Sequence, residues 1–145
     1  MTTVFVIDAS VVVKWYLPEI FTEEAEKYVH PSIRLIAPDY LQVECANVLC
    51  KKIRNNHLHF MEGERILNHL LTSRWIEFIS TQTLIRRTYK IANDLQHPFY
   101  DCLYFMVAIQ LGKPLVTADR KFYESVKNSD YSHLMVWVEE PPRME

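Results

Sequence analysis

Apolar positions along the chain follow two periods. Short and almost continuous apolar runs predict buried strands, whereas apolar residues that recur every three or four positions predict amphipathic helices. The predicted strands cover residues 3–7, 33–37, 75–80, 115–117 and 134–138. The predicted helices cover residues 10–17, 22–30, 39–54, 60–72, 83–96, 100–111 and 121–127. Since helices separate the strands, we expect an α/β fold, an α/β/α sandwich with a mostly parallel central sheet.

Some helix ends are marked by residues that stop a helix. Pro18 ends the first helix, because proline lacks a backbone N–H and clashes with the preceding turn. Gly112 follows the helix at 100–111, where a left-handed residue often closes the last turn. That helix is nearly all apolar, so we expect it in the core. The helix at 60–72 is expected to bury one stripe, made of Ile66, Leu67, Leu70 and Leu71.

Length and composition indicate one globular domain. The chain has 145 residues, and 49% of them are hydrophobic, which is enough for a core without disulfide support. No repeat, linker or low-complexity tract divides the sequence. We therefore predict a single domain over residues 1–145.

Several classes of protein are excluded by the cysteines, the glycines and the amino-terminal sequence. Cys45, Cys50 and Cys102 are odd in number and lack the paired spacing of a zinc site, so reduced thiols are expected. Two glycines, Gly63 and Gly112, cannot supply a glycine-rich phosphate loop, which excludes the P-loop and the dinucleotide fingerprint. The first residues lack a basic segment before their short apolar run, and no apolar stretch reaches membrane-spanning length. We expect a cytoplasmic protein.

Four carboxylates stand in apolar surroundings where a charge is costly. Asp8 and Asp119 follow predicted strands, and ligands of parallel sheets bind at the carboxyl ends of strands. Glu44 and Asp101 lie within predicted helices, on faces that also carry apolar residues. Without these four acids, the 16 Lys and Arg residues exceed the other acids, which is a weak indication of a polyanionic partner. We infer that the four carboxylates converge on one cavity.

Carboxylates without histidine or cysteine select hard cations, so Mg²⁺ or Mn²⁺ is expected rather than zinc or copper. Such an ion can activate water and neutralise charge on a phosphodiester during its displacement. Each acid also has an ordinary explanation. Asp8 and Asp119 could be turn or helix N-cap residues, Glu44 could pair with Lys51 or Lys52, and Asp101 could be a first-turn acid favoured by the helix dipole.

Four segments in order along the chain resemble the successive motifs of PIN-domain ribonucleases, and the closest resemblance is to VapC-type toxins. They are residues 6–15, which contain Asp8; 38–49, which contain Glu44; 100–104, which contain Asp101; and 115–122, which contain Asp119. The resemblance spans nearly the whole chain. Cys102 departs from the alanine that is common at its position in the family.

The resemblance implies a PIN-like fold and a Mg²⁺- or Mn²⁺-dependent endoribonuclease, the toxin of a VapBC-type toxin-antitoxin pair. Its implied catalytic residues and metal ligands, direct or through water, are Asp8, Glu44, Asp101 and Asp119. Ser10, Asn47 and Thr117 would support these ligands, although a helix cap explains Ser10 and a strand-end hydroxyl explains Thr117 equally well. The implied partners are an RNA substrate, a small antitoxin protein and, by analogy, a second copy of the chain.

Basic residues near the acidic motifs could contact the RNA backbone. Lys14, Arg120 and Lys121 are the candidates, and a solvated surface charge is the ordinary alternative for each. Two other functions remain open at this point. One is an aspartate-nucleophile phosphatase, although Asp8-Ala9-Ser10 lacks the second aspartate usual in that family, and the other is a non-catalytic interaction module on the same scaffold.

Overall fold

Five strands form one sheet in which every neighbouring pair is parallel. The computed structural model describes residues 2–144. The strands lie in the order β3-β2-β1-β4-β5. Their bounds are β1 Thr3–Ile7, β2 Ile33–Pro38, β3 Ile76–Ile79, β4 Leu115–Thr117 and β5 Met135–Trp137. The α/β class and the parallel sheet predicted from the sequence are confirmed.

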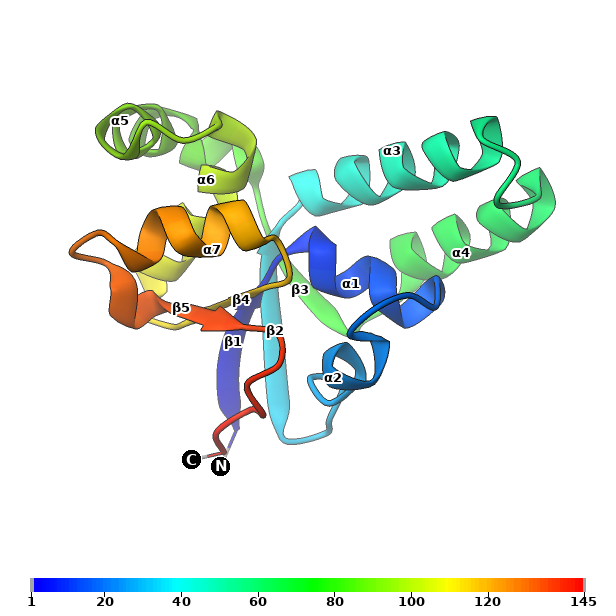
Figure 1. Cartoon of the computed structure of the whole chain (residues 1–145), viewed down its shortest axis with the longest axis horizontal. Helices are drawn as coiled ribbons and strands as arrows, with labels where there is room; N and C mark the ends of the chain where they lie inside the picture. Colours follow the sequence, from blue (N-terminus) through cyan, green and yellow to red (C-terminus); the bar gives the residue numbers. More distant parts are fainter. Residues whose placement is uncertain (1, 145) are drawn as a thin grey trace.

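Helices cover both faces of this sheet. Figure 1 shows α1 to α4 on one side and α5 to α7 on the other. Their bounds are α1 Ala9–Tyr16, α2 Thr22–Glu26, α3 Tyr40–Arg54, α4 Phe60–Thr72, α5 Ile85–Leu95, α6 Phe99–Leu111 and α7 Arg120–Lys127, with short 3-10 helices η1 Thr81–Leu84 and η2 Ser132–Leu134. The strands therefore lie in the middle of an α/β/α sandwich.

The strand order reverses between β1 and β4. From β1 the chain proceeds outward to β2 and β3, and it then returns through α5 and α6 to place β4 on the other flank of β1. Ile7 is paired with Val116 in this register, and the backbone N–H of Asp8 donates to the carbonyl of Val116 at 3.1 Å. A parallel sheet binds ligands at such a reversal, outside the carboxyl ends of its strands. Asp8 and Asp119 both lie at this edge.

The core is a single cluster of buried side chains between the helices and the sheet. Helix α6 contributes most to it, because all seven residues from Cys102 to Ala108 are buried. This confirms the expectation for the nearly all-apolar helix. Gly112 then closes α6 with a positive φ of 60°, a conformation that glycine adopts without steric cost.

Two predicted helices differ from the observed ones. The helix expected over 22–30 stops at Glu26, after which Tyr28 and Val29 form tighter hydrogen bonds to carbonyls three residues earlier. Tyr28 turns into the core against Phe5, which a continued helix would not allow. The helix expected over 83–96 is divided into η1 and α5, and Gln96 ends it with φ of 51°.

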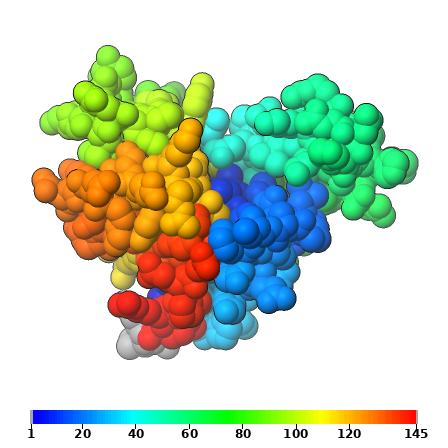
Figure 2. Space-filling model, viewed as in Figure 1, coloured from blue at the N-terminus to red at the C-terminus, as the bar shows by residue number. Residues whose placement is uncertain are grey.

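The stripe predicted for α4 is wrong in part. Leu70 is buried, but Ile66 and Leu67 are half-buried and Leu71 is 50% exposed. Helix α4 packs on α3 and projects with it away from the sheet, so only one side of it is covered (Figure 1). Figure 2 shows these two helices as a separate lobe, in cyan to green, with the molecule hollowed between this lobe and the α7 side in orange.

Within residues 2–144, no helix combines the length and the apolarity that crossing a membrane requires.

Candidate active site

Asp8 is a buried carboxylate at the end of β1. Its side chain is 3% exposed, and Oδ2 accepts hydrogen bonds from Ser10 Oγ at 2.5 Å and from Thr117 Oγ1 at 2.8 Å. Oδ1 is also buried, and it has no hydrogen-bond partner among the described residues. Asp8 makes no side-chain cap hydrogen bond to α1, so the N-cap explanation fails for it. A buried carboxylate oxygen without a partner is costly, which makes Oδ1 the most unusual atom of the site.

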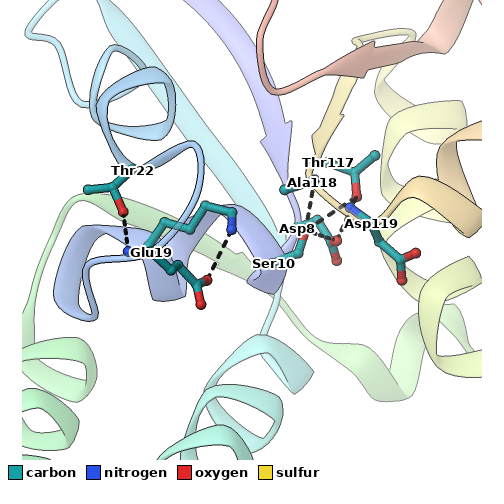
Figure 3. Close-up of polar contacts among 8 residues, drawn as sticks. Asp8, Ser10, Glu19, Thr22, Thr117, Ala118 and Asp119 are labelled. Atoms are coloured by element: carbon teal, nitrogen blue, oxygen red, sulfur yellow. Dashed lines mark hydrogen bonds and ion pairs between the residues drawn. The ribbon is translucent and has the colours of Figure 1, made fainter.

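The two hydroxyls beside Asp8 have fixed orientations. Ser10 Oγ accepts the backbone N–H of Ala118 at 2.9 Å, and Thr117 Oγ1 accepts that of Asp119 at 3.1 Å. Because each oxygen accepts a backbone proton, its own proton is directed to Asp8. Figure 3 shows this network joining the ends of β1 and β4. Ser10 therefore bonds across the sheet edge rather than capping its own helix.

Asp119 follows β4 and begins α7. Its Oδ1 accepts the backbone N–H of Phe122 at 3.2 Å, so the helix N-cap explanation holds for this residue. The cap engages Oδ1, and the side chain is only half-buried. Asp119 can therefore cap α7 through Oδ1 and still use Oδ2 for another contact.

Glu44 reaches the same region from α3. Its Oε1 accepts a hydrogen bond at 3.0 Å from Tyr104, whose side chain is fully buried on α6. No ion pair joins Glu44 to Lys51 or Lys52 in the described part of the chain, so that alternative fails. The apolar pattern of α6 predicts Tyr104 in the core, but it does not predict the contact with Glu44, because the two residues lie 60 positions apart.

Asp101 lies in the first turn of α6 and contacts a histidine that no sequence motif indicates. His97 Nε2 lies 2.8 Å from Asp101 Oδ2, and the imidazole stacks on Phe122 with centroids 5.0 Å apart. His97 precedes Pro98, outside the helix, so helical spacing does not predict the contact. This stacking links α7 to the segment before α6.

Burial and mutual repulsion raise the pKa of three of the four acids. Burial raises the pKa of Asp8 to about 6 against the effect of the Ser10 and Thr117 hydrogen bonds, and the charges of Asp101 and Asp119 raise it further. Burial and the charge of Asp8 raise the pKa of Glu44 to about 8. Burial raises the pKa of Asp101 too, and the charge of Asp119 adds to it. The four carboxylates thus lie within electrostatic reach of one another.

The donor set fits a hard divalent cation. It consists of carboxylate oxygens, and Asp8 Oδ1 is an acceptor that lacks a partner. Residues 2–144 contain no group of three or more His, Cys, Asp or Glu side chains that could enclose an ion. Magnesium, however, keeps several waters and typically uses only one or two carboxylates. A hydrated ion held by one or two of these carboxylates is therefore compatible with this finding.

The remaining candidates lie in different environments. Asn47 is exposed on α3, and no side-chain hydrogen bond to Glu44 is found in the described residues. Lys14 is buried and forms an ion pair with Glu19 at 3.0 Å, so the expectation that it is available to RNA is corrected. Arg120 and Lys121 are exposed at the start of α7, where the Arg120 guanidinium lies 4.0 Å from the Trp137 ring centroid.

Comparison with known proteins finds the same scaffold. A family model described as PIN domain matches residues 5–127. A protein named Ribonuclease VapC3, from Pyrobaculum aerophilum, is 29% identical over 120 residues, which is 82% of this chain and 92% of that protein. The crystal structure of PAE2754 from Pyrobaculum aerophilum has a TM-score of 0.66 and 20% identity, and covers 94% of this chain and 85% of that one. The second likeness concerns the fold alone.

Proposed function

Because this chain belongs to the PIN domain family, we propose that it is a metal-dependent endoribonuclease that hydrolyses RNA phosphodiester bonds, as the toxin of a VapBC-type pair. The name of the relative Ribonuclease VapC3 supports the ribonuclease activity and the toxin assignment. Family membership leaves the aspartate-nucleophile phosphatase without support.

The observation that carries this proposal is the unpaired Oδ1 of Asp8. Two oriented hydroxyls hold Oδ2, so the side chain cannot rotate without breaking both hydrogen bonds. Oδ1 is consequently held in a buried position without a hydrogen-bond partner among the described residues. A protein without a cation partner for this atom would gain stability by replacing the carboxylate, since an uncompensated buried charge costs free energy.

In the proposed site, Asp8, Glu44, Asp101 and Asp119 hold one or two Mg²⁺ or Mn²⁺ ions, directly or through water. Bound there, the metal supplies an activated water and neutralises charge on the phosphodiester. Ser10 and Thr117 keep Asp8 oriented. Tyr104 and His97 do the same for Glu44 and Asp101, because ligands whose second oxygen is hydrogen-bonded are held in place.

Arg120 and Lys121 are the basic residues we propose for contact with the RNA backbone. They stand exposed directly after Asp119, so a phosphate near the acids would lie close to both. We propose in addition that a small antitoxin binds the protein, as the toxin assignment requires. A cytoplasmic location stays a prediction.

The test is cleavage of total RNA by the purified protein with Mg²⁺ or Mn²⁺, and with EDTA in their place. We expect cleavage with metal only, and none by Asp8→Asn or Asp119→Asn, because each removes a carboxylate charge. Asp94→Asn, an exposed acid of α5, is the matched control and should cleave like the wild type. Unchanged cleavage by folded Asp8→Asn protein would overturn the proposal. Absence of any cleavage, together with no Mn²⁺-induced rise in melting temperature, would support a non-catalytic module instead.

A further inference from the structure

Two tyrosines stack on each other between α3 and α6, next to the acids. Tyr40 begins α3, one helical turn before Glu44, so the two side chains share a face of that helix. Tyr100 directly precedes Asp101 in the first turn of α6. The two rings have centroids 5.2 Å apart and an interplanar angle of 14°. The pair therefore connects the two helices that carry Glu44 and Asp101.

One ring of this pair remains open to solvent. Tyr100 is 59% exposed, although Tyr40 covers one of its faces and Phe99 meets it edge-on at 6.2 Å. Tyr40 can cover only one face of the Tyr100 ring, because the two rings are nearly parallel. An accessible aromatic ring is the kind of surface on which a nucleobase can stack.

Hydrogen bonds hold the backbone at Tyr40, on whose ring Tyr100 stacks. The backbone N–H of Tyr40 donates to Thr81 Oγ1 at 2.8 Å, and the backbone N–H of Thr81 donates to Asp39 Oδ1 at 3.0 Å. These bonds attach the start of α3 to η1, the 3-10 helix that follows β3. Tyr100 thus stacks on a ring whose helix end is anchored, and a preoriented ring loses little conformational entropy when a ligand stacks on it.

The chemistry of this place favours an uncharged planar group. Burial, together with the charges of Glu44, Tyr100 and Asp101, raises the pKa of Tyr40, so its ring stays neutral. The same carboxylates repel a bare phosphate. A nucleobase is planar and uncharged, and base stacking on aromatic side chains is the usual way in which proteins bind unpaired nucleotides.

We propose that Tyr100, supported by Tyr40, is a stacking platform for one unpaired nucleobase of the RNA next to the bond that is cleaved. This inference rests on the proposed ribonuclease function and deepens it. A base inside a helix has both faces covered by its neighbours, so the platform can accept a base only from a single-stranded or flipped-out position. The platform would therefore select loops and single strands over duplex RNA.

The test compares RNA binding by three variants in an Asp119→Asn background, in which the proposed function predicts no cleavage. Fluorescence anisotropy measures the Kd of a short labelled single-stranded RNA with Mn²⁺ present, and of the same sequence annealed to its complement. Tyr100→Leu keeps an apolar side chain but removes the aromatic face. Tyr100→Phe keeps the face and removes the hydroxyl. Tyr89→Leu is the matched control, since Tyr89 is an exposed tyrosine on α5.

We expect Tyr100→Leu to weaken single-strand binding about tenfold and to leave duplex binding unchanged. We expect the Kd of the Asp119→Asn protein to stay unchanged when Tyr100→Phe or Tyr89→Leu is added. If the Tyr40–Tyr100 stack only fastens α3 to α6, Tyr100→Leu will lower the melting temperature without changing the Kd, and the platform is overturned. An equal loss of affinity for single-stranded and duplex RNA overturns the platform as well.

The proposed function fails in a different way. If the wild-type protein cleaves RNA with metal but Tyr100→Leu binds like its parent, the platform alone falls and the ribonuclease assignment stands. If the wild-type protein neither binds nor cleaves RNA, both fall together.

Discussion

At the scale of single residues, the sequence located the unusual charges but not the atoms that hold them. Asp8 and Asp119 were recognisable because each follows an apolar strand, and the structure brings both to one sheet edge. His97 and Tyr104 were not recognised as neighbours of acids, because their contacts depend on how α6 packs against α3 and α7. Asn47 lies at a suitable helical spacing from Glu44 and yet faces solvent. Spacing along one element predicts a shared face, and contacts between elements need the packed fold.

The buried carboxylates predict how stability depends on pH. The pKa of Asp8 in the folded state, about 6, exceeds its ordinary value of 3.8, so folding favours the protonated form. Without metal, stability should therefore fall as pH rises from about 4 through 6, and further toward 8 as Glu44 ionises. A shift of two pKa units at Asp8 corresponds to about 3 kcal/mol in the free energy of unfolding.

Thermal unfolding in EDTA at pH 5 and pH 8 measures this effect. The metal-free wild type should melt at a lower temperature at pH 8, and Asp8→Asn should melt higher than the wild type at that pH. Millimolar Mn²⁺ should raise the melting temperature of the wild type at pH 8 and have little effect on Asp8→Asn. A metal-free melting temperature that is constant or increases from pH 5 to pH 8 would contradict the expectation.

At the scale of elements, the predictions succeeded where the pattern was strong and local. The strands at 3–7 and 115–117 and the helix at 60–72 coincide with the observed elements. The end of α2 was misjudged because Tyr28 leaves the helix to reach Phe5, a contact that exists only after the sheet has formed. Leu71 was misjudged because periodicity reveals an apolar stripe without saying whether a neighbour covers it.

The α3–α4 lobe depends on a close approach at Gly63. A Cβ atom added there would lie 3.0 Å from Ile53 Cδ1 and 3.3 Å from Leu58 Cδ2, both at the ends of flexible side chains. Gly63→Ala should be nearly neutral, since the crowding is offset by the better helix propensity of alanine. Gly63→Leu cannot fit without separating the helices, and we expect it to lower the free energy of unfolding by about 1–3 kcal/mol. Urea unfolding of the two variants measures the difference, and equal stabilities would contradict it.

At the scale of the whole molecule, one hydrophobic cluster joins the sheet to helices on both sides of it. This supports the proposal that residues 1–145 form a single domain. The lobe, in contrast, exposes apolar side chains that the cluster does not include, namely Val43, Phe60, Met61 and Leu71. Apolar surface that is left exposed is a feature of protein interfaces.

We therefore expect a homodimer whose covered face includes the α3–α4 lobe. Light scattering after size exclusion should give a mass twice that of the 17.2 kDa chain. Met61→Lys should convert the dimer to a monomer, because it would bury a charge at the interface, whereas Lys90→Met on α5 should not change the mass. A monomeric wild type would contradict this prediction.

The hydrogen bond between Thr117 and Asp8 joins residues 109 positions apart in the sequence. During synthesis the amino-terminal part of a chain emerges first, and β1 can pair with β2 well before β4 is available. Asp8 then lacks its Thr117 partner, and Asp119 has not yet been translated. A nascent chain consequently cannot assemble the candidate site until the segment through Asp119 has left the ribosome. In this topology the assembly of the candidate site waits for β4, the strand that supplies Thr117.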